Sequence, residues 1–469
     1  MDKLFDLIII GAGPGGYAAA EHAAKFGMKT AVIEERELGG TCINRGCIPT
    51  KSLIYAARLY SIMNHCGQFG LQFEQGSFDL KKIFSYKDDA VGQFREGIRH
   101  KFQENGITYI EGHARVIGSK SVRVAAADGS ETTYGAQHIL IASGARPAIP
   151  PIPGVLLPGV VTSREVLSEP VWNYDRFVII GGGVVGIEFA TVFNALGAQV
   201  SVIEQAERLL PPMDEELSEN LESLLRSRGI EVYTGAQVER ITNEGGLACC
   251  FTQASVEQTL PATRILVAVG RRANIDNLTG ENVSLETRNG RIVVNGDFMT
   301  SIRGVYAVGD VIEGIQLAHL ASAQGIHVVE KLAGKPSSVL LSTVPSGAFV
   351  DLPIVPSCIY IDPEIASVGI SEAEAKRHGI SVKCGRYSMS GNGKAIISKE
   401  ESGFIKLVFE AHSRMLIGAQ MICPRATDMI GELATAIANG LTARHLMFAM
   451  RAHPTFNEGI AEAIRNIEE

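Results

Sequence analysis

The apolar positions at the beginning of the chain follow a strand pattern, then a helix pattern, then a strand pattern again. Leu4 to Ile10 form an apolar run, Tyr17 to Phe26 have helical character, and Thr30 to Ile33 form a second apolar run. Gly27 ends the helical segment. This order predicts a strand–helix–strand unit built on a buried sheet.

The same pattern returns near the middle of the chain. Phe177 to Ile180 and Val200 to Ile203 are short apolar runs on either side of a helical segment. Five landmarks repeat with one offset of 170 residues: Gly11 and Gly181, Gly13 and Gly183, Gly16 and Gly186, Gly27 and Gly197, and Glu34 and Glu204. Because one offset fits all five pairs, the sequence predicts two domains of the same design.

In each unit a glycine-rich loop with the spacing G-x-G-x-x-G joins strand to helix. Gly11 permits the tight turn, Gly13 lets the backbone approach a pyrophosphate, and Gly16 lets the helix pack on the strand. The helix N-terminus faces the phosphates, and Glu34 can accept hydrogen bonds from a ribose. A second dinucleotide site is expected at the equivalent residues, Gly181, Gly183, Gly186 and Glu204.

The acidic residue of the second unit bears on which nucleotide binds there. Glu204 would repel a 2′-phosphate and accept a 2′-hydroxyl, and Gln205 and Ala206 offer no cation. Arg208 is close in sequence, but Leu209 and the residues after it indicate that it leads into a loop. The pattern therefore favours NAD over NADP.

The rest of the chain predicts two longer helices and a separate C-terminal region. The helices are expected at Lys51 to Ser61 and Phe78 to Asn105, and a linker at Gly334 to Pro353. An α+β region follows, with a strand at Ile405 to Phe409 and helices from Ala426 onward. We expect an α/β fold with two Rossmann-like dinucleotide-binding domains plus a C-terminal α+β domain, in four segments: 1–150, 151–272, 273–345 and 346–469.

Composition narrows the class of protein. A chain of 469 residues is long enough for three or four domains. The net charge of −8 does not favour a nucleic-acid or anionic membrane partner. No run of 18 apolar residues exists, and the first strand leaves no room for a signal peptide, so we expect a cytoplasmic protein.

Two cysteines in the glycine-rich stretch 39–51 are the first candidates for chemistry. Cys42 and Cys47 are five positions apart, which in a regular helix separates their Cα atoms by roughly 8–9 Å. A disulfide needs about 4.4–6.8 Å, so a bridged pair excludes a plain helix. Pro49 in a first helical turn and Lys51 would favour a Cys47 thiolate. The alternative is two unrelated free cysteines in a loop.

Two further candidate sites, His453 with Glu458 and Asp310, each have a structural alternative to the functional role. Pro454 keeps His453 out of a helix, and Glu458 could orient its imidazole as a general base for thiol chemistry; the alternative is a surface histidine. Asp310 follows an apolar strand and could hold a ribityl hydroxyl or cap the next helix. The six other cysteines are expected to be buried packing residues, and no metal site is expected.

Together these motifs resemble the flavin-dependent pyridine nucleotide–disulfide oxidoreductases over essentially the whole chain. The resemblance rests on the cysteine stretch, both glycine loops, Gly309–Asp310 and the His453–Glu458 pair. Leu317 to His319 and the Gly418 region resemble the branch that oxidises dihydrolipoamide. The resemblance implies FAD in the first domain, with the segment 273–345 completing its site, NAD in the second, and a homodimer formed through the last domain.

The resemblance also implies residue roles. Cys47 would face the flavin, Cys42 would exchange with substrate, and Lys51 would lie near the flavin N5, paired with Glu188. His453 would arrive from the other subunit, held by Glu458. Beyond the two glycine loops and their glutamates, cofactor contacts are expected at Lys51, Gly40, Thr41, Ala114, Gly144, Gly309, Asp310, Ala318, Val238 and Gly270.

The implied activity is oxidation of dihydrolipoyl groups through a Cys42–Cys47 disulfide and FAD to reduce NAD. The partner would be a lipoyl-bearing protein of a 2-oxoacid dehydrogenase or glycine-cleavage system. A glutathione reductase would need cations in place of Glu204, a mercuric reductase would need a terminal cysteine pair, and a non-catalytic flavoprotein subunit would lose a site residue. The chain departs from the family pattern at Arg451, Asn457 and a longer linker at 340–356.

Overall fold

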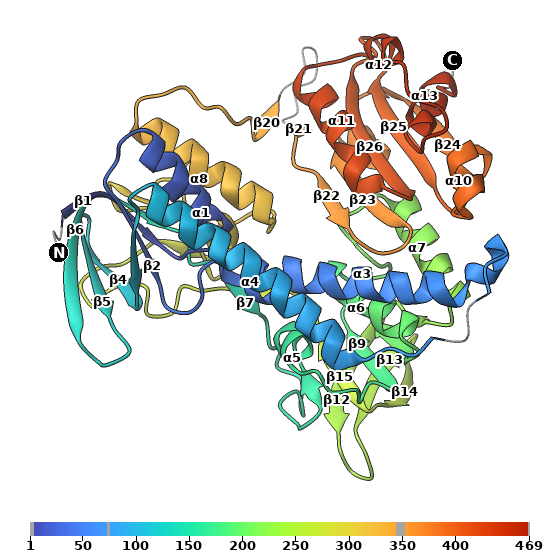
Figure 1. Ribbon diagram of the computed structural model, residues 1–469, viewed down its shortest axis with the longest axis horizontal. Helices are drawn as coiled ribbons and strands as arrows, with labels where there is room; N and C mark the ends of the chain where they lie inside the picture. The colour runs from blue at the N-terminus through green and yellow to red at the C-terminus, as the bar shows by residue number, and fades with distance from the viewer. Residues whose placement is uncertain (1–3, 73–75, 344–351, 468–469) are drawn as a thin grey trace.

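The computed structural model describes residues 4–72, 76–343 and 352–467. Its first sheet has the strand order β3-β2-β1-β6-β5-β4, with β19 beside β6 (Figure 1). The strands β1, β2, β3, β6 and β19 run parallel, as the apolar runs in β1 and β2 predict. The strands are β1 (Leu4–Ile10), β2 (Thr30–Glu34), β3 (Thr108–Glu111), β4 (His113–Gly118), β5 (Ser121–Ala125), β6 (Glu131–Ile141) and β19 (Val305–Ala307).

Two helices from distant parts of the chain cover one region of this sheet together. The helix α1 (Pro14–Lys25) lies beside α8 (Ala318–Leu332) (Figure 1). Glycine allows the close approach, because a Cβ on Gly325 would overlap the carbonyl oxygen of Gly15. The segment after residue 273 thus joins the first domain through both β19 and α8.

The two predicted long helices are present, with boundaries shifted by one to four residues. The helix α4 (Leu80–Glu104) begins after Asp79, whose side chain accepts a hydrogen bond from the backbone of Lys82. The helix α3 (Cys47–Asn64) begins four residues earlier than expected, because Gly46 separates it from α2 (Gly40–Arg45). In Figure 1, α3 runs between the C-terminal domain above and the second sheet below.

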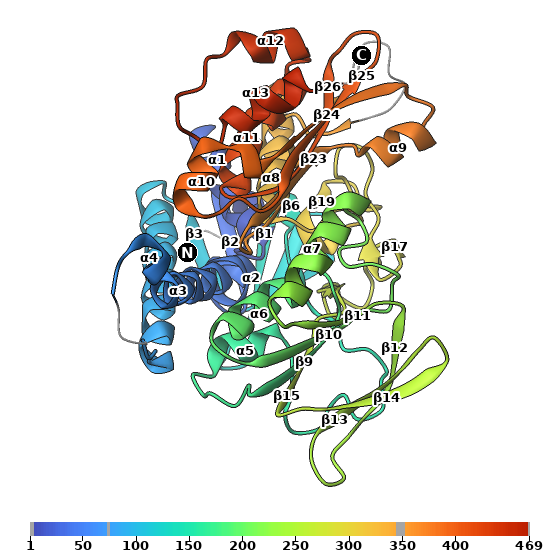
Figure 2. The same ribbon diagram turned by 90° about the vertical axis from the view of Figure 1, so that its right-hand side faces the viewer.

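The second sheet repeats the first on a smaller scale, with the order β11-β10-β9-β15-β8. The parallel pair β9 and β10 and the helix α6 between them correspond to β1, β2 and α1. A separate antiparallel sheet, β12-β13-β14, extends from it (Figure 2). The elements are β8 (Val160–Val161), α5 (Ser163–Ser168), β9 (Arg176–Ile180), α6 (Val184–Ala195), β10 (Gln199–Ile203), α7 (Glu215–Ser227), β11 (Glu231–Tyr233), β12 (Ala236–Thr242), β13 (Ala248–Gln253), β14 (Val256–Pro261) and β15 (Arg264–Val267).

The C-terminal domain is an antiparallel sheet, β22-β23-β26-β25-β24, with helices packed against it (Figures 1 and 2). The expected strand at 405–409 is β25, and the helix expected from residue 426 is α11. The elements are β22 (Ser357–Ile359), β23 (Glu364–Gly369), α9 (Glu372–Arg377), β24 (Val382–Ser388), α10 (Gly393–Ser398), β25 (Phe404–Glu410), β26 (Leu416–Cys423), α11 (Ala426–Ala438), α12 (Ala443–Phe448) and α13 (Glu458–Arg465).

The predicted fold class is confirmed: two dinucleotide-type α/β domains and a C-terminal α+β domain. The segment boundaries at 150, 272 and 345 stay predictions. Part of the expected long linker, residues 344–351, lies outside the described residues. Within the described ranges, no helix is both long and apolar enough to cross a membrane.

Candidate active site

A disulfide bridges the break between two helices. Cys42 lies in α2 and Cys47 is the first residue of α3, with Gly46 between the helices at φ −147° and ψ −105°. The Cα atoms of the cysteines are 4.6 Å apart, about half the separation in a continuous helix. A Cβ on Gly46 would come within 3.0 Å of the carbonyl oxygen of Thr41. Glycine at this position therefore makes the bend compatible with the bridge.

One turn along α3, Lys51 meets a buried carboxylate of the second domain. Its Nζ atom donates to both carboxylate oxygens of Glu188 on α6, each at 2.8 Å. The backbone N–H of Tyr360 donates to the same carboxylate at 3.1 Å. The Lys51 ammonium also lies 4.6 Å from the centre of the Tyr360 ring, a cation–π contact. Three parts of the chain thus fix the lysine beside the disulfide.

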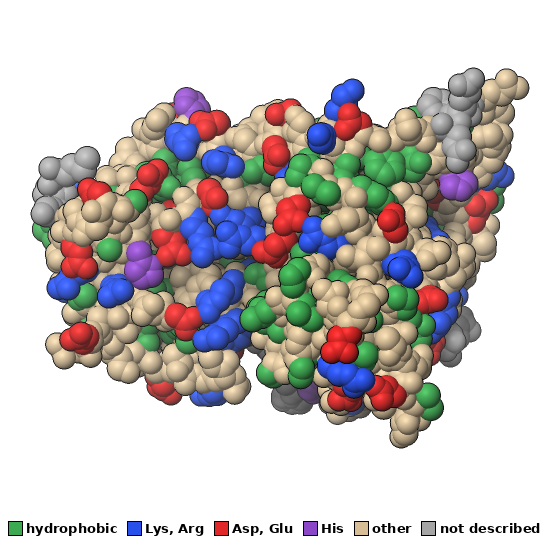
Figure 3. Space-filling view, turned by 90° about the horizontal axis from the view of Figure 1, so that it is seen from below, with side chains coloured by type: hydrophobic (Ala, Val, Ile, Leu, Met, Phe, Trp, Pro, Cys, Tyr) green, Lys and Arg blue, Asp and Glu red, His purple; other side chains and the backbone are tan. Residues whose placement is uncertain are grey.

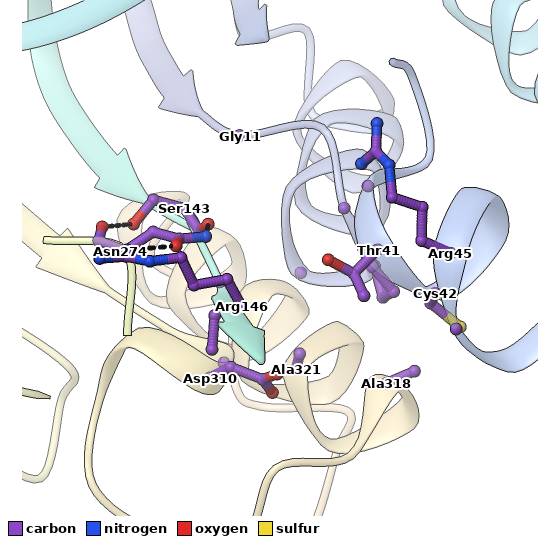
Figure 4. Close-up of a pocket in the computed structure, with 18 of the residues that line it drawn as sticks. Gly11, Thr41, Cys42, Arg45, Ser143, Arg146, Asn274, Asp310, Ala318 and Ala321 are labelled. Atoms are coloured by element: carbon purple, nitrogen blue, oxygen red, sulfur yellow. Dashed lines mark hydrogen bonds between the residues drawn. The ribbon is translucent and has the colours of Figure 1, made fainter. Parts of the chain in front are cut away.

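A cavity of about 510 Å³ runs from the disulfide along the carboxyl end of the first sheet (Figure 4). It brings together most residues expected to touch FAD with the cysteine pair and Glu188, which are expected to be catalytic. Those lining it are Gly11, Gly13, Glu34, Gly40, Thr41, Cys42, Cys47, Lys51, Ala114, Gly144, Glu188, Gly309, Asp310 and Ala318. Gly16 lies behind the loop, where a Cβ would overlap the carbonyl oxygen of Gly11.

The cavity wall is shaped to receive phosphate groups. The loop after β1 and the first turn of α2 approach so closely that a Cβ on Gly40 would lie 2.6 Å from the Cα of Gly13. The N-terminus of α1 opens on this cradle without a side-chain cap, so the positive end of the helix dipole faces a ligand bound there.

Four arginines stand around the cavity, and each is paired with a carboxylate. Arg36, Arg45, Arg146 and Arg271 line it. Burial, and then the charges of Arg164 and other neighbouring arginines, lower the pKa of Arg45. Figure 3 shows Lys and Arg side chains gathered on the lower face of the molecule, despite the net negative charge of the chain. The glycine cradle, with its close backbone approach at the helix N-terminus, fits a dinucleotide such as FAD.

The two repeat glutamates make the same hydrogen bonds 170 residues apart. Glu34 accepts from the backbone N–H of Ala12 at 2.8 Å and of Arg36 at 2.9 Å. Glu204 accepts from Gly182 at 2.6 Å and Ala206 at 2.8 Å. Burial raises the pKa of Glu34, although its two backbone donors oppose that shift. Each carboxylate is thus oriented by its own loop and has lone pairs left for ribose hydroxyls.

Val238 differs from the other residues expected at the second nucleotide site, because it lies in the separate antiparallel sheet. Gly181 has a φ of +112°, and a Cβ on Gly186 would overlap the carbonyl oxygen of Gly181, as in the first unit. Gly270 lies in the turn after β15 with open space around it. Val238 instead lies on β12 and packs against the hydrophobic cluster beneath the second sheet. Gly183 is the N-cap of α6, in the same backbone conformation as Gly13 before α1.

Asp310 lines the cavity and does not cap a helix. Its carboxylate lies 3.3 Å from the Nε atom of Arg271. The next helix, α8, begins after Leu317 and has no side-chain cap. The structure therefore removes the N-cap alternative and leaves the Asp310 carboxylate on the cavity wall.

His453 and Glu458 are paired, but His453 does not line the cavity. The Nδ1 atom of His453 lies 2.9 Å from Glu458 at the start of α13, and its side chain is 77% exposed. The backbone N–H of Thr455 donates to the other Glu458 oxygen, and this bond, followed by the one from His453, lowers the pKa of Glu458. The peptide bond between His453 and Pro454 is cis. Figures 1 and 2 place the loop between α12 and α13 far from the start of α3.

Several residues of the cavity were not predicted from the sequence. Ser143 and Asn274 exchange hydrogen bonds of 2.8 and 2.9 Å, and Arg146 donates to the Asn274 side chain (Figure 4). Val184 and Val185, in the first turn of α6, also line the cavity. Only the Ser143–Gly144 turn after a predicted strand could have pointed to this group, because Asn274 lies in no recognisable motif.

The expectation that the other six cysteines are buried is wrong for half of them. Cys249, Cys250 and Cys423 are buried in strands, whereas Cys66, Cys358 and Cys384 are only partly buried. Cys358 lines the cavity, and burial raises its pKa to about 11, which keeps the thiol protonated at neutral pH. It lies in β22, two residues before Tyr360, whose ring is 4.6 Å from the Lys51 ammonium on α3. No sequence motif predicts this contact.

Comparisons with known proteins agree with this geometry. Residues 5–325 match the family described as pyridine nucleotide-disulphide oxidoreductase, and residues 355–464 match the dimerisation domain of that family. The chain is 38% identical to a dihydrolipoyl dehydrogenase of Bacillus subtilis, covering 98% of this chain and 97% of that protein. It is 36% identical to a dihydrolipoyl dehydrogenase of Chlorobaculum tepidum, covering 98% and 96%.

Solved structures lead to the same group. LpdA from Mycobacterium tuberculosis superposes with a TM-score of 0.89 at 25% identity, covering 98% of this chain and 99% of that chain. The HOCl-induced flavoprotein disulfide reductase RclA from Escherichia coli superposes with a TM-score of 0.84 at 26% identity, with coverage of 98% and 99%. The expected cofactors, FAD and NAD, are those of this family. The chain belongs to the pyridine nucleotide-disulphide oxidoreductases and carries both the nucleotide-binding part and the dimerisation domain of that family.

Proposed function

We propose that this protein is a dihydrolipoamide dehydrogenase, which oxidises dihydrolipoyl groups and reduces NAD. One observation carries the proposal: the Cys42–Cys47 disulfide opens on the same cavity as the first glycine loop. A redox-active bridge and a dinucleotide cradle in one cavity suit electron transfer between a dithiol and a bound cofactor. The curated relatives named dihydrolipoyl dehydrogenase, matched over nearly the whole chain, support lipoamide as the dithiol.

The chain's own residues account for the thiol chemistry. A thiolate of dihydrolipoamide attacks the Sγ atom of Cys42, the Cys42–Cys47 bond breaks, and Cys47 takes the electron pair as a thiolate. The second substrate thiol, deprotonated by His453, attacks the substrate sulfur of the mixed disulfide. Cys42 leaves with the electron pair of the broken bond and takes the proton held by His453, and the substrate closes to its cyclic disulfide. A flavin held by the cavity residues would supply the redox chemistry that links the dithiol to NAD.

Cys47 and Lys51 form the end of the site that faces the cofactor. The N-terminus of α3 and the Lys51 ammonium both favour negative charge on Cys47. Glu188 keeps the ammonium in place through two hydrogen bonds. The expected cofactor contacts on the cavity wall, from Gly11 to Ala318, would hold FAD.

We place His453 in the active site of a second copy of the chain. Within one chain it is exposed, paired with Glu458 and outside the cavity. The matched dimerisation domain, residues 355–464, contains both residues. A homodimer would therefore bring a base held by a carboxylate to each disulfide, and a single copy would have no complete site.

The proposed acceptor is NAD rather than NADP. Glu204 would repel a 2′-phosphate, and two backbone N–H groups fix its position. Arg208, the nearest cation after it in sequence, donates instead to the carbonyl of Pro211 at 2.9 Å. We further propose a lipoyl-bearing protein of a 2-oxoacid dehydrogenase or glycine-cleavage system as partner, and the cytoplasm as location.

The test is absorbance of reduced nicotinamide when the flavin-loaded protein is mixed with dihydrolipoamide and NAD, with NADP in parallel. We expect reduction of NAD and little of NADP. The variant Cys42→Ser should lose this activity while NADH still bleaches its flavin. Equal rates with NADP would contradict the role of Glu204. If NADH bleaches the flavin but dihydrolipoamide reduces neither nucleotide, lipoamide is not the substrate, and glutathione disulfide should be assayed next.

A further inference from the structure

One carboxylate holds both ends of the loop that presents His453. Two residues before the histidine, Arg451 donates through Nη2 to Glu432 on α11. Four residues after it, Asn457 donates through Nδ2 to the other Glu432 oxygen at 3.4 Å. We propose that Glu432, Arg451 and Asn457 are positioning residues that hold His453 in its catalytic orientation. This inference rests on the role of His453 in the proposed function.

Arg451 is built into the protein rather than placed on its surface. Its side chain is only 7% exposed. Besides the bond to Glu432, its Nη1 atom lies 3.3 Å from the carbonyl oxygens of Leu446 and Ala449, at the end of α12. A buried guanidinium must be paired to offset its lost hydration. Its planar fork lets Arg451 join α11, the end of α12 and the loop, which a lysine could not do equally well.

The ring of His453 depends on this framework. The imidazole is largely exposed, and its one hydrogen bond in the described part of the chain is to Glu458. The middle of the loop is fixed from the N-cap of α10, because the Asn392 side chain donates to the carbonyl of Thr455 at 3.1 Å. With so little packing of its own, the orientation of the ring follows from the backbone between the two anchors.

The two anchors are also the positions where the sequence departs from the family pattern. Arg451 and Asn457 stand on opposite sides of His453, and the structure gives them a common partner in Glu432. A shared partner means that the two residues act as one clamp across the loop. Removing either contact with Glu432 should therefore displace the imidazole of His453 while leaving its hydrogen-bond partner, Glu458, in the chain.

The expected consequence is confined to one half of the reaction. A positioned general base contributes about 10²–10⁴-fold to rate, and a misplacement of about 1 Å can cost roughly 10²-fold. Oxidation of dihydrolipoamide needs His453 in the proposed mechanism, whereas reduction of the flavin by NADH does not. A loosened clamp should therefore separate the two rates, and a general loss of folding would lower both.

The experiment compares Arg451→Met, Arg451→Lys and Asn457→Ala in the flavin-loaded protein. For Arg451→Met we expect kcat with dihydrolipoamide and NAD to fall by about 10²-fold, with the rate of flavin bleaching by NADH unchanged. Its pH–rate profile should lose the limb that is also missing in His453→Gln. Arg451→Lys and Asn457→Ala should show the same split to a smaller degree. Arg465→Met is the matched control, because Arg465 pairs with Glu462 on the surface of the same domain.

Each result decides between the two proposals. If His453→Gln keeps full dihydrolipoamide turnover, the proposed role of His453 is wrong and the clamp falls with it. If His453→Gln loses activity but Arg451→Met and Asn457→Ala do not, the clamp alone is wrong. If Arg451→Met does not fold, Asn457→Ala, which removes only the 3.4 Å bond, must still separate the two rates. An equal loss of both rates in that variant would also overturn the clamp.

Discussion

Glu188 is a buried carboxylate at which three parts of the chain meet. It accepts two hydrogen bonds from Lys51 and one from the backbone of Tyr360, and it is only 3% exposed. Its donors come from α3 and from the segment after β22, while Glu188 itself belongs to α6. Replacing it removes one charge from a contact that joins the first domain, the second domain and the C-terminal domain.

We expect Glu188→Gln to lower the free energy of unfolding by about 2 kcal/mol, because glutamine keeps the volume but gives up the charge-assisted bonds to Lys51. The measurement is urea unfolding of the flavin-loaded protein. Glu257→Gln is the control, since Glu257 pairs with Arg240 at the surface of the same domain and should leave stability near that of the wild type. Equal midpoints for the two variants would show that Glu188 does not join the domains.

Site residues could be predicted from the sequence where the residues of one motif lie close together in the chain. Cys42 and Cys47 share one stretch, and Glu34 and Glu204 stand at a fixed distance from their glycines. Cys358 and Asn274, the partner of Ser143, could not be predicted, because each lies more than 100 residues from the motifs of the first domain. Hydrogen bonds from or to the backbone, such as those of Asn274 with Ser143 and of Tyr360 with Glu188, depend on no particular residue type and leave no pattern in the sequence.

At the scale of elements, each strand–loop–helix unit could be predicted from the sequence, but the distant elements that pack against it could not. The loop spacing requires a strand before it and a helix after it, and both units have this order. The pairing of β19 with β6 and the packing of α8 on α1 were not predicted, since either contact joins segments more than 150 residues apart. The early start of α3 follows from the backbone at Gly46, which a helix pattern cannot reveal.

We expect equivalent substitutions in the two glycine loops to impair the binding of different cofactors. A Cβ on Gly16 would overlap the carbonyl oxygen of Gly11, and one on Gly186 would overlap that of Gly181. We expect Gly16→Ala to force α1 away from β1, so that the protein purifies without its yellow flavin. Gly186→Ala should remain yellow, but NADH should bleach its flavin far more slowly. Absorbance of the purified proteins and stopped-flow reduction by NADH would measure both effects.

Gly97→Ala is the matched control for this pair. Gly97 lies within α4, and a Cβ there meets no atom within 4 Å. The variant should keep its flavin and its rate of bleaching, because alanine fits an open helical position. If Gly186→Ala lost its flavin as Gly16→Ala does, the second unit would not be an independent nucleotide site.

At the scale of the whole molecule, a single chain holds every proposed catalytic group but not in one place. The disulfide, Lys51 and Glu188 share the cavity, whereas His453 and Glu458 lie at the surface of the dimerisation domain. The sequence could indicate this arrangement only through the family resemblance, because nothing in the spacing of His453 says which copy of the chain it serves. A symmetric dimer resolves the separation if each copy lends its histidine to the other.

This arrangement predicts that two inactive variants restore each other. Neither Cys42→Ser nor His453→Gln homodimers should oxidise dihydrolipoamide. When the two chains are produced together and assemble at random, about half of the dimers are mixed and each mixed dimer has one intact site, so about a quarter of wild-type activity should return. Pairing Cys42→Ser with Cys47→Ser is the control: both changes disable the same disulfide, so no combination of chains is complete. If the first pair stays as inactive as the control, His453 does not act across the dimer. The histidine would then have to reach the disulfide of its own chain.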